Sequence, residues 1–311
     1  MAAQPLFVSS GDLIADRRYR WALDYLKQGD PAAAAEVLEQ VVETAPGFAT
    51  AWFALAVIRE QLGRHQAAVS AFRAACDADP EDYHGARLHL SRLGASSATP
   101  SMTATYVRRL FDQHAPDFDR SLLEQLQYRG PAVLLDAIRD ATGPALGFDA
   151  VLDLGCGTGL AGEAIRPHCK HLAGVDISAA MVERARDKKL YDVLAVGELS
   201  EFLVSATARY DLVLAADVFV YCADLAPICA SVARILAPGG LFAFTVEFHG
   251  GADAVLQPTL RYAHGEPHVR SAIGTAGLGL RRLDPVSTRK EKGEWMPGLV
   301  AVAMAPPAAI A

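Results

Sequence analysis

The stretch Val151-Leu152-Asp153-Leu154-Gly155-Cys156-Gly157-Thr158-Gly159 decides the fold. A short apolar run leads directly into a Gly-x-Gly-x-Gly turn, and the amphipathic segment that follows predicts a helix. The three glycines remove Cβ atoms from the turn, so its backbone can lie close to a ligand. Free N–H groups at the helix start suit polar or anionic ligand atoms. The stretch therefore predicts a ligand-binding strand–turn–helix unit.

An acidic residue stands at the distance that such a unit needs. Asp176 ends the second apolar run, Gly174-Val175-Asp176, 21 residues after Gly155. A carboxylate at this strand end can accept hydrogen bonds from both ribose hydroxyls of a nucleotide-like cofactor. The glycine turn and the acid together are a much more specific signal than the glycines alone.

Short apolar runs alternate with amphipathic segments through the last two-thirds of the chain. The runs predict strands at 150–154, 172–176, 190–196, 210–216, 241–247, 278–283 and 299–304. The amphipathic segments predict helices at 106–111, 118–126, 132–141, 159–168, 179–188, 225–236 and 268–276. This alternation predicts an α/β fold with a doubly wound, Rossmann-like parallel sheet, whose ligands bind at the carboxyl ends of the strands.

The first third of the chain repeats itself every 34 residues. Six pairs of residues share this offset: Gly29 and Gly63, Pro46 and Pro80, Ala22 and Ala56, Ala34 and Ala68, Trp21 and Leu55, and Leu38 and Phe72. Small residues at a fixed period of this length predict stacked helix–turn–helix units. The pattern resembles tetratricopeptide repeats, with units at 15–48 and 49–82 and a capping helix at 83–93.

We expect four segments: an N-terminal tail at 1–14, an all-α repeat domain at 15–94, a linker at 95–105 and an α/β domain at 106–311. The linker is rich in small polar residues. Because two and a half repeats are few for a continuous core, we expect the repeats to lean on the second domain or on another copy of the chain. They are predicted to serve as a docking or self-association module, or as a groove that binds a protein partner.

Composition excludes several classes of protein. Among 311 residues, 51% are hydrophobic and 21% charged, which disfavours a disordered chain. The net charge of -7 disfavours a nucleic-acid-binding surface. No apolar run reaches the roughly 18–20 residues of a membrane helix, and no signal peptide is visible. The five cysteines include no Cys-x-x-Cys pair, so no metal site is expected and a cytoplasmic location is favoured.

The spacing of the glycines separates two cofactor classes. Dinucleotide sites use Gly-x-Gly-x-x-Gly, whereas here the third glycine comes one position earlier and Asp153 precedes the first glycine by two residues. This arrangement resembles the first motif of class I S-adenosylmethionine-dependent methyltransferases. The segments Ala215-Ala216-Asp217-Val218 and Ala237-Pro238-Gly239-Gly240 match later motifs of that family. Together with the repeats, the chain is similar to a bacterial group of methyltransferases that carry tetratricopeptide repeats.

The resemblance implies S-adenosylmethionine as cofactor and S-adenosylhomocysteine as product. It implies a set of cofactor-binding residues: Asp153, Gly155, Cys156, Gly157, Gly159, Asp176, Ile177, Met181, Glu198, Leu199 and Asp217. It also implies that the aromatic segment 111–119, with Phe111 and Phe118, folds over the cofactor and excludes water. Arg129 is the candidate partner of the cofactor's carboxylate, with a surface ion pair as the alternative.

Residues after the fourth and fifth strands are candidates for the acceptor side. We expect Tyr221, His249 and Arg261 to contact substrate, and His264 or Tyr262 to act as a general base where the acceptor must lose a proton. The run Leu260-Arg261-Tyr262-Ala263-His264 resembles a segment of the same repeat-bearing group and is expected on a loop above the sheet edge. Ordinary exposed loop residues are the alternative.

Three functions remain open at this point. The first is a methyltransferase that acts on a small molecule by in-line transfer. The second is a protein methyltransferase whose repeats hold its substrate. The third is a repeat adaptor that binds S-adenosylmethionine without turnover. The segment Asp217-Val218-Phe219-Val220 lacks the Asn/Asp-Pro-Pro-Tyr/Phe motif, which disfavours adenine and glutamine as acceptors.

Overall fold

The computed structural model describes residues 9–96 and 102–308. The chain divides into two compact units, with the division between Tyr106 and Val107. The linker predicted at 95–105 lies partly outside the described residues, as does most of the predicted tail. Of the helices in the described ranges, none is both long and apolar enough to cross a membrane.

The first unit consists of helices α1 to α5, as the 34-residue period predicts. Their bounds are α1 Leu13–Lys27, α2 Pro31–Thr44, α3 Ala49–Gln61, α4 His65–Ala78 and α5 Ala86–Arg92. Gly29 and Gly63 turn the chain between paired helices at φ of 80° and 72°, a conformation that favours glycine. Ala22 and Ala56 are fully buried, which lets the helices approach closely. The two predicted helical units and their cap are confirmed.

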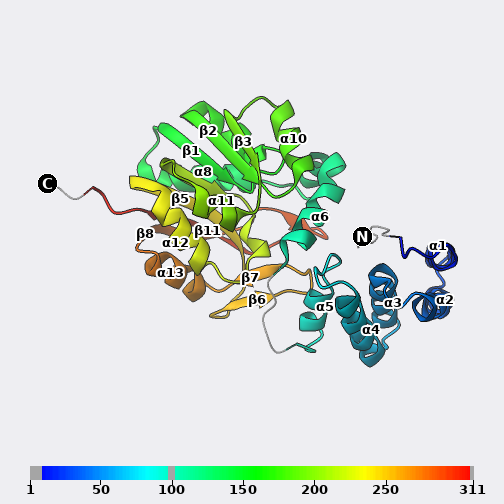
Figure 1. Ribbon diagram of the computed structural model, residues 1–311. Helices are drawn as coiled ribbons and strands as arrows, with labels where there is room; N and C mark the ends of the chain where they lie inside the picture. The colour runs from blue at the N-terminus through cyan, green and yellow to red at the C-terminus, as the bar shows by residue number, and fades with distance from the viewer. Residues whose placement is uncertain (1–8, 97–101, 309–311) are drawn as a thin grey trace. The chain divides into compact units, whose positions relative to one another are not determined.

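The second unit contains a nine-stranded sheet, of which seven strands form one continuous path (Figure 1). The path runs β3-β2-β1-β4-β5-β11-β8. Its strands are β1 Phe148–Leu154, β2 Cys169–Asp176, β3 Val193–Val196, β4 Tyr210–Ala215, β5 Leu236–Phe248, β8 Gly279–Val286 and β11 Gly298–Met304. The prediction of an entirely parallel sheet is wrong, since β11 pairs antiparallel with both β5 and β8.

Helices cover both faces of this sheet, so the doubly wound architecture is confirmed (Figure 1). The helices are α6 Ala104–His114, α7 Phe118–Arg120, α8 Gly130–Thr142, α9 Leu160–Ile165, α10 Ala179–Asp187, α11 Leu199–Ser205, α12 Ala226–Ile235 and α13 Glu266–Thr275. One apolar core packs α11, α12 and α13 against one face. A second core packs α8 and α9 against the opposite face.

Short elements connect the strands and helices of this unit. They are the 3-10 turns η1 Ala115–Asp117, η3 Arg166–His168 and η4 Phe219–Tyr221, the π turn η2 Ser121–Gln125, and the strands β6 Ala254–Leu256, β7 Tyr262–His264, β9 Lys290–Glu291 and β10 Glu294–Trp295. The prediction of a loop at 260–264 is wrong for the last three residues, because β7 pairs parallel with the end of β5.

Candidate functional site

The glycine turn after β1 adopts a conformation that requires glycine. Gly155, Gly157 and Gly159 have φ of 65°, 53° and 91°, all in the left-handed region. A Cβ on Gly155 would lie 2.6 Å from Cγ2 of Val218, so even alanine would clash there. The Cys156 N–H donates to the carbonyl of Val175 (3.0 Å), which ties the turn to β2.

Asp176 joins the ends of β1 and β2. One carboxylate oxygen accepts from the Gly157 N–H (2.9 Å) and the other from the Ser178 N–H (2.8 Å). Burial raises the pKa of Asp176, and these backbone donors oppose that rise. Its position beside Gly157 is the one that sequence reasoning assigns to the ribose-binding acid.

Asp153 lies beneath the turn and depends on a residue that sequence reasoning missed. Tyr191 donates its hydroxyl to Oδ2 of Asp153 at 2.7 Å. The Tyr191 ring fills a slot made by three glycines, because Cβ atoms on Gly159, Gly162 and Gly174 would lie 3.1, 2.3 and 2.8 Å from its atoms. Burial raises the pKa of Asp153 to about 7. Oδ1 of Asp153 has no hydrogen-bond partner among the described residues.

The aromatic segment 111–119 is held over the glycine turn by polar contacts. Ser178 donates its hydroxyl to Asp112 at 2.5 Å, and Thr158 donates its hydroxyl to Asp119. Lys188 also pairs with Asp119, at 2.9 Å. The structure therefore brings together two segments that are far apart in the sequence, as the expectation of a cover requires.

Aromatic rings connect the 111–119 segment to Tyr221, one of the residues predicted to contact the acceptor. A Cβ on Gly157 would lie 3.9 Å from the Phe118 ring. Phe111 packs edge-on against Phe118 and against Tyr221, with ring centroids 6.0 and 5.2 Å apart. Tyr221 belongs to η4 and is hydrogen-bonded to Arg261. Phe111, Phe118, Tyr221 and Arg261 therefore form one continuous wall.

Asp217 anchors a buried polar network at the end of β4. This residue has φ of 55°, a left-handed conformation that is uncommon for a residue with a side chain. Its carboxylate accepts from the hydroxyls of Thr245 and Thr288, both at 2.8 Å. Arg289 lies 3.5 Å from the same carboxylate. The Asp217 side chain is thus fixed in one orientation.

The network continues through two arginines and two glutamates. Arg289 pairs with Glu247 and, at 3.1 Å, with Glu291. Arg261 pairs with Glu291 and lies 3.7 Å from Glu247. Burial lowers the pKa of Arg289, as does Arg261, but the surrounding carboxylates outweigh both and raise it overall. With Asp217, three carboxylates surround two guanidinium groups, and the network carries one excess negative charge. Sequence reasoning missed Arg289, Thr288 and Glu291.

The remaining residues predicted at the cofactor lie after β1, β2 and β3, in the turns and helices that follow these strands. Met181 is fully buried in α10, and Ile177 and Leu199 are partly buried. Glu198 accepts from the Glu201 N–H (2.9 Å) and thereby caps α11. Burial raises the pKa of Cys156, so its thiol stays protonated. Contact of these residues with a cofactor stays a prediction.

Arg129 is engaged away from the glycine turn. Its Nε donates to the carbonyl of Ser287 at 2.8 Å, and its guanidinium lies 4.5 Å from the ring centroid of Trp295. Its predicted pairing with the cofactor's carboxylate stays a prediction.

The assignment of His264 or Tyr262 as a general base is not supported by their surroundings. Both side chains are fully buried in β7. Nε2 of His264 lies 3.2 Å from the Phe219 carbonyl, and burial lowers the His264 pKa to about 4. Burial raises the pKa of Tyr262 to about 12. His249 lies on the loop between β5 and β6, where its Nδ1 accepts from the Gly251 N–H (3.1 Å) and its Nε2 lies 2.6 Å from the Asp253 carbonyl.

Comparisons with known proteins place this site in a family. Residues 152–244 match the model of a methyltransferase domain, and residues 19–83 match that of a tetratricopeptide repeat. The chain is 29% identical over 189 residues to a malonyl-[acyl-carrier protein] O-methyltransferase of Enterobacter lignolyticus, covering 58% of this chain and 71% of that protein. It is 28% identical over 213 residues to human methyltransferase-like protein 27, covering 67% and 81%.

A solved structure supports the fold alone. The [4+2]-cyclase SpnF is 17% identical and superimposes with a TM-score of 0.53 over 68% of this chain and all of that one. Together with the family matches, the sheet and the glycine turn define a class I methyltransferase domain that follows helical repeats in the sequence. The chain is an S-adenosylmethionine-dependent methyltransferase.

The residues present fit S-adenosylmethionine. The Gly157 turn leaves open space where other residues would place a Cβ, and Asp176 stands beside it. Asp153 offers a buried carboxylate oxygen without a partner, which suits a cationic ammonium group. Asp153, Gly157 and Asp176 would hold the cofactor, and Phe118 would cover it.

Proposed function

We propose that the acceptor is a small molecule, methylated by direct in-line transfer beneath the 111–119 segment. The observation that carries this proposal is the attachment of that segment across the glycine turn, through Asp112 to Ser178 and through Asp119 to Thr158. A covered site suits a compact acceptor, whereas a polypeptide substrate needs an open groove. Covering the site also excludes water.

Methyl transfer from a sulfonium depends on the alignment of the acceptor with the methyl group more than on a general base. When bound, the cofactor supplies an electrophilic methyl group carried on a sulfonium sulfur. The residues around it position the acceptor and keep the site dry, which supplies most of the acceleration of such a displacement. Since His264 and Tyr262 are buried, an acceptor that is already nucleophilic near neutral pH fits best. Carboxylates, which are ionised at neutral pH, are a common group of that kind, whereas aliphatic amines are protonated there and must first lose a proton.

A similar protein supports the choice of small acceptors in part. The relative from Enterobacter lignolyticus is named as a malonyl-[acyl-carrier protein] O-methyltransferase. Its name specifies an acyl acceptor attached to a carrier. Small carboxylates, both free and attached to a carrier, therefore belong in the first set of acceptors to be tried.

Release of S-adenosylhomocysteine tests the proposal. The purified chain is incubated with S-adenosylmethionine and with small carboxylates, carrier-linked acyl groups, amines or a peptide pool. We expect turnover with a small acceptor, and at least about tenfold less with Asp176→Ala at the same, subsaturating cofactor concentration. Turnover with peptides alone would instead establish a protein methyltransferase. Cofactor binding without turnover on any acceptor would favour the adaptor.

We also propose that the repeats associate with a protein partner or a second copy, and that the protein works in the cytoplasm. The presence of tetratricopeptide repeats supports the first part. All five cysteines are free thiols, which suits a reducing compartment. Cell fractionation with an antibody to the chain tests the location, and enrichment in a secreted fraction would contradict it.

A further inference from the structure

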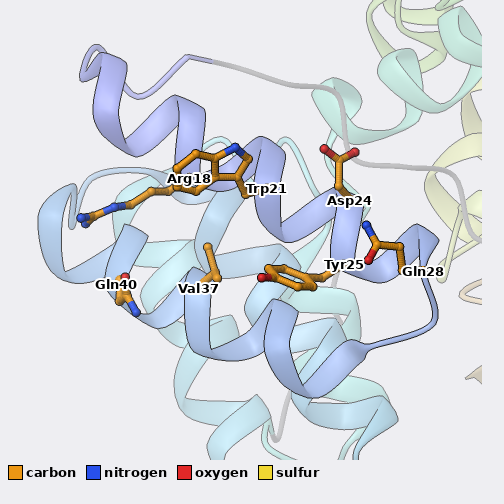
Figure 2. A pocket seen from close by; sticks show the side chains of 7 residues that line it. All are labelled: Arg18, Trp21, Asp24, Tyr25, Gln28, Val37 and Gln40. Atoms are coloured by element: carbon orange, nitrogen blue, oxygen red, sulfur yellow. The ribbon is translucent and has the colours of Figure 1, made fainter.

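The outer face of α1 exposes apolar side chains. Leu13, Ile14, Trp21 and Tyr25 are 86%, 61%, 50% and 39% exposed. A groove of about 620 Å³ runs along this face between α1 and α2 (Figure 2). Its lining residues are Arg18, Trp21, Asp24, Tyr25, Gln28, Val37 and Gln40. We call this surface the α1 groove.

The repeat shows what normally covers such a face. Adding 34 residues to Arg17, Trp21 and Asp24 gives Ala51, Leu55 and Ile58. The first three are exposed on α1, while the second three are buried on α3. α3 packs against α2 of the preceding unit. In the second repeat, this face of the first helix is therefore covered by α2. In the first repeat, no described residue of α1 to α5 covers the same face.

The α1 groove has the composition of an interface. Trp, Tyr and Arg are enriched at protein interfaces, and three of the seven lining residues, Arg18, Trp21 and Tyr25, are of these types. The guanidinium of Arg17 lies 5.0 Å from the ring centroid of Trp21. A purely solvated end of the array would carry short polar or charged residues in place of Trp21 and Tyr25.

The order of residues along α1 is self-complementary about Trp21. Arg18 and Asp24 each lie three residues from Trp21, in opposite directions, and Arg17 and Tyr25 each lie four residues from it. An antiparallel pair of α1 helices centred on Trp21 therefore places Arg18 opposite the partner's Asp24. Twofold symmetry forms this ion pair twice, together with two Arg17–Tyr25 cation–π contacts.

We propose that a second copy of this chain docks antiparallel on the α1 groove and forms a twofold dimer. Within one copy, Asp24 pairs with Lys27 (3.1 Å) and Arg18 donates to Thr44 (3.4 Å). Both contacts are exposed and cost little to exchange for intermolecular ones. The proposal deepens the association suggested above for the repeats, and no part of it depends on methyl transfer.

Sedimentation velocity of the full chain over a hundredfold range of concentration tests the dimer. We expect a reversible dimer whose dissociation constant rises at least about 30-fold in Trp21→Ala. Asp24→Arg and Arg18→Asp should each weaken the dimer about tenfold or more, since each opposes like charges at two sites. The double variant Arg18→Asp/Asp24→Arg restores both pairs and should restore the dimer. Trp295→Ala, an exposed tryptophan of the other unit, is the matched control.

Each contrary result overturns the proposal. A wild-type chain that stays monomeric throughout the concentration range overturns the proposal, whether the α1 groove is then bare or holds a different protein. A dimer that is unchanged in both single charge reversals also overturns the proposal, because a surface other than the α1 groove must then form the dimer. Failure of the double variant to restore the dimer overturns the antiparallel pairing. Calorimetry with S-adenosylhomocysteine on the same samples reports the methyltransferase site separately, so the two proposals fail independently.

Discussion

Replacing Tyr191 by phenylalanine isolates the hydrogen bond beneath the glycine turn. Tyr191→Phe keeps the ring that fills the slot beside Gly162 and Gly174, and removes the hydroxyl that donates to Asp153 at 2.7 Å. The other oxygen of Asp153 has no partner among the described residues, so the variant leaves a buried carboxylate without its side-chain donor. Losing a hydrogen bond to an ionised buried group costs about 1.5–3 kcal/mol.

The cost should depend on pH in a defined direction. Burial raises the pKa of Asp153 from 3.8 in the unfolded chain to about 7, so the folded state holds the proton more tightly. Its contribution to stability is therefore fully present below about pH 4 and is lost as the pH rises through about 7. The Tyr191 hydroxyl favours the ionised form, and its removal should raise the Asp153 pKa further, by about one to two units.

Urea unfolding at about pH 5 and about pH 8 measures this dependence. At pH 8 the variant can protonate Asp153, which limits the loss, so Tyr191→Phe should destabilise by about 1 kcal/mol more at the higher pH than at the lower, where Asp153 is protonated in both chains. In an Asp153→Asn background the pH dependence of the substitution should disappear. Tyr210→Phe, which alters a phenol of β4, is the control. An equal cost at both pH values, or simple additivity with Asp153→Asn, would refute the reasoning.

Three other perturbations probe the cofactor side, the buried imidazoles and the independence of the second unit. Asp176→Ala should weaken S-adenosylhomocysteine binding by about 10- to 150-fold in calorimetry, and Asp176→Asn by less, because its amide oxygen still accepts one bond. Burial lowers the pKa of His89 and of His264 to about 4 each, so the stability that these two groups contribute is lost as the pH drops from about 6.5 toward 4, opposite in sign to the contribution of Asp153. His264→Gln removes one of the two losses, so thermal melts of this variant should fall less, or rise more, than those of the wild type over that range; an unchanged slope would contradict the assignment. Residues 107–311 produced alone should bind S-adenosylhomocysteine as the full chain does, and a loss of binding would show that the repeats support the site.

Local spacing explains what the sequence could predict. The 34-residue period located the paired helices to within a few residues, because each unit repeats its own small buried positions, such as Ala22 and Ala56. Alternation of apolar runs located the strands for the same reason. Neither pattern carries the direction of a strand, and so the antiparallel insertion of β11 between β5 and β8 was missed.

The glycine turn and Asp176 were predictable because their residues act through the backbone at a fixed chain distance. Tyr191 was not singled out, although a sequence signal for it exists. Gly162 and Gly174 lie outside the Gly-x-Gly-x-Gly motif, and glycine in a helix and in a strand needs a reason. That reason is the Tyr191 ring, whose atoms lie within 3 Å of where both Cβ atoms would be.

The polar network around Asp217 could not be predicted, because its residues are far apart in the sequence and are brought together only by the order of the strands in the sheet. Arg289 follows β8 and lies 72 residues after Asp217, yet the two pair. Because β11 runs antiparallel between β5 and β8, the carboxyl end of β8 lies at the same edge of the sheet as the carboxyl ends of β4 and β5. Arg129 and His264 were chosen for their place near the core or near a strand end, which gives position along the chain but not the direction of a side chain. Burial then decides the chemistry. The imidazole of His264, enclosed behind η4, is held neutral and serves packing, while the guanidinium of Arg289 lies among three carboxylates and helps to fix the orientation of the Asp217 side chain.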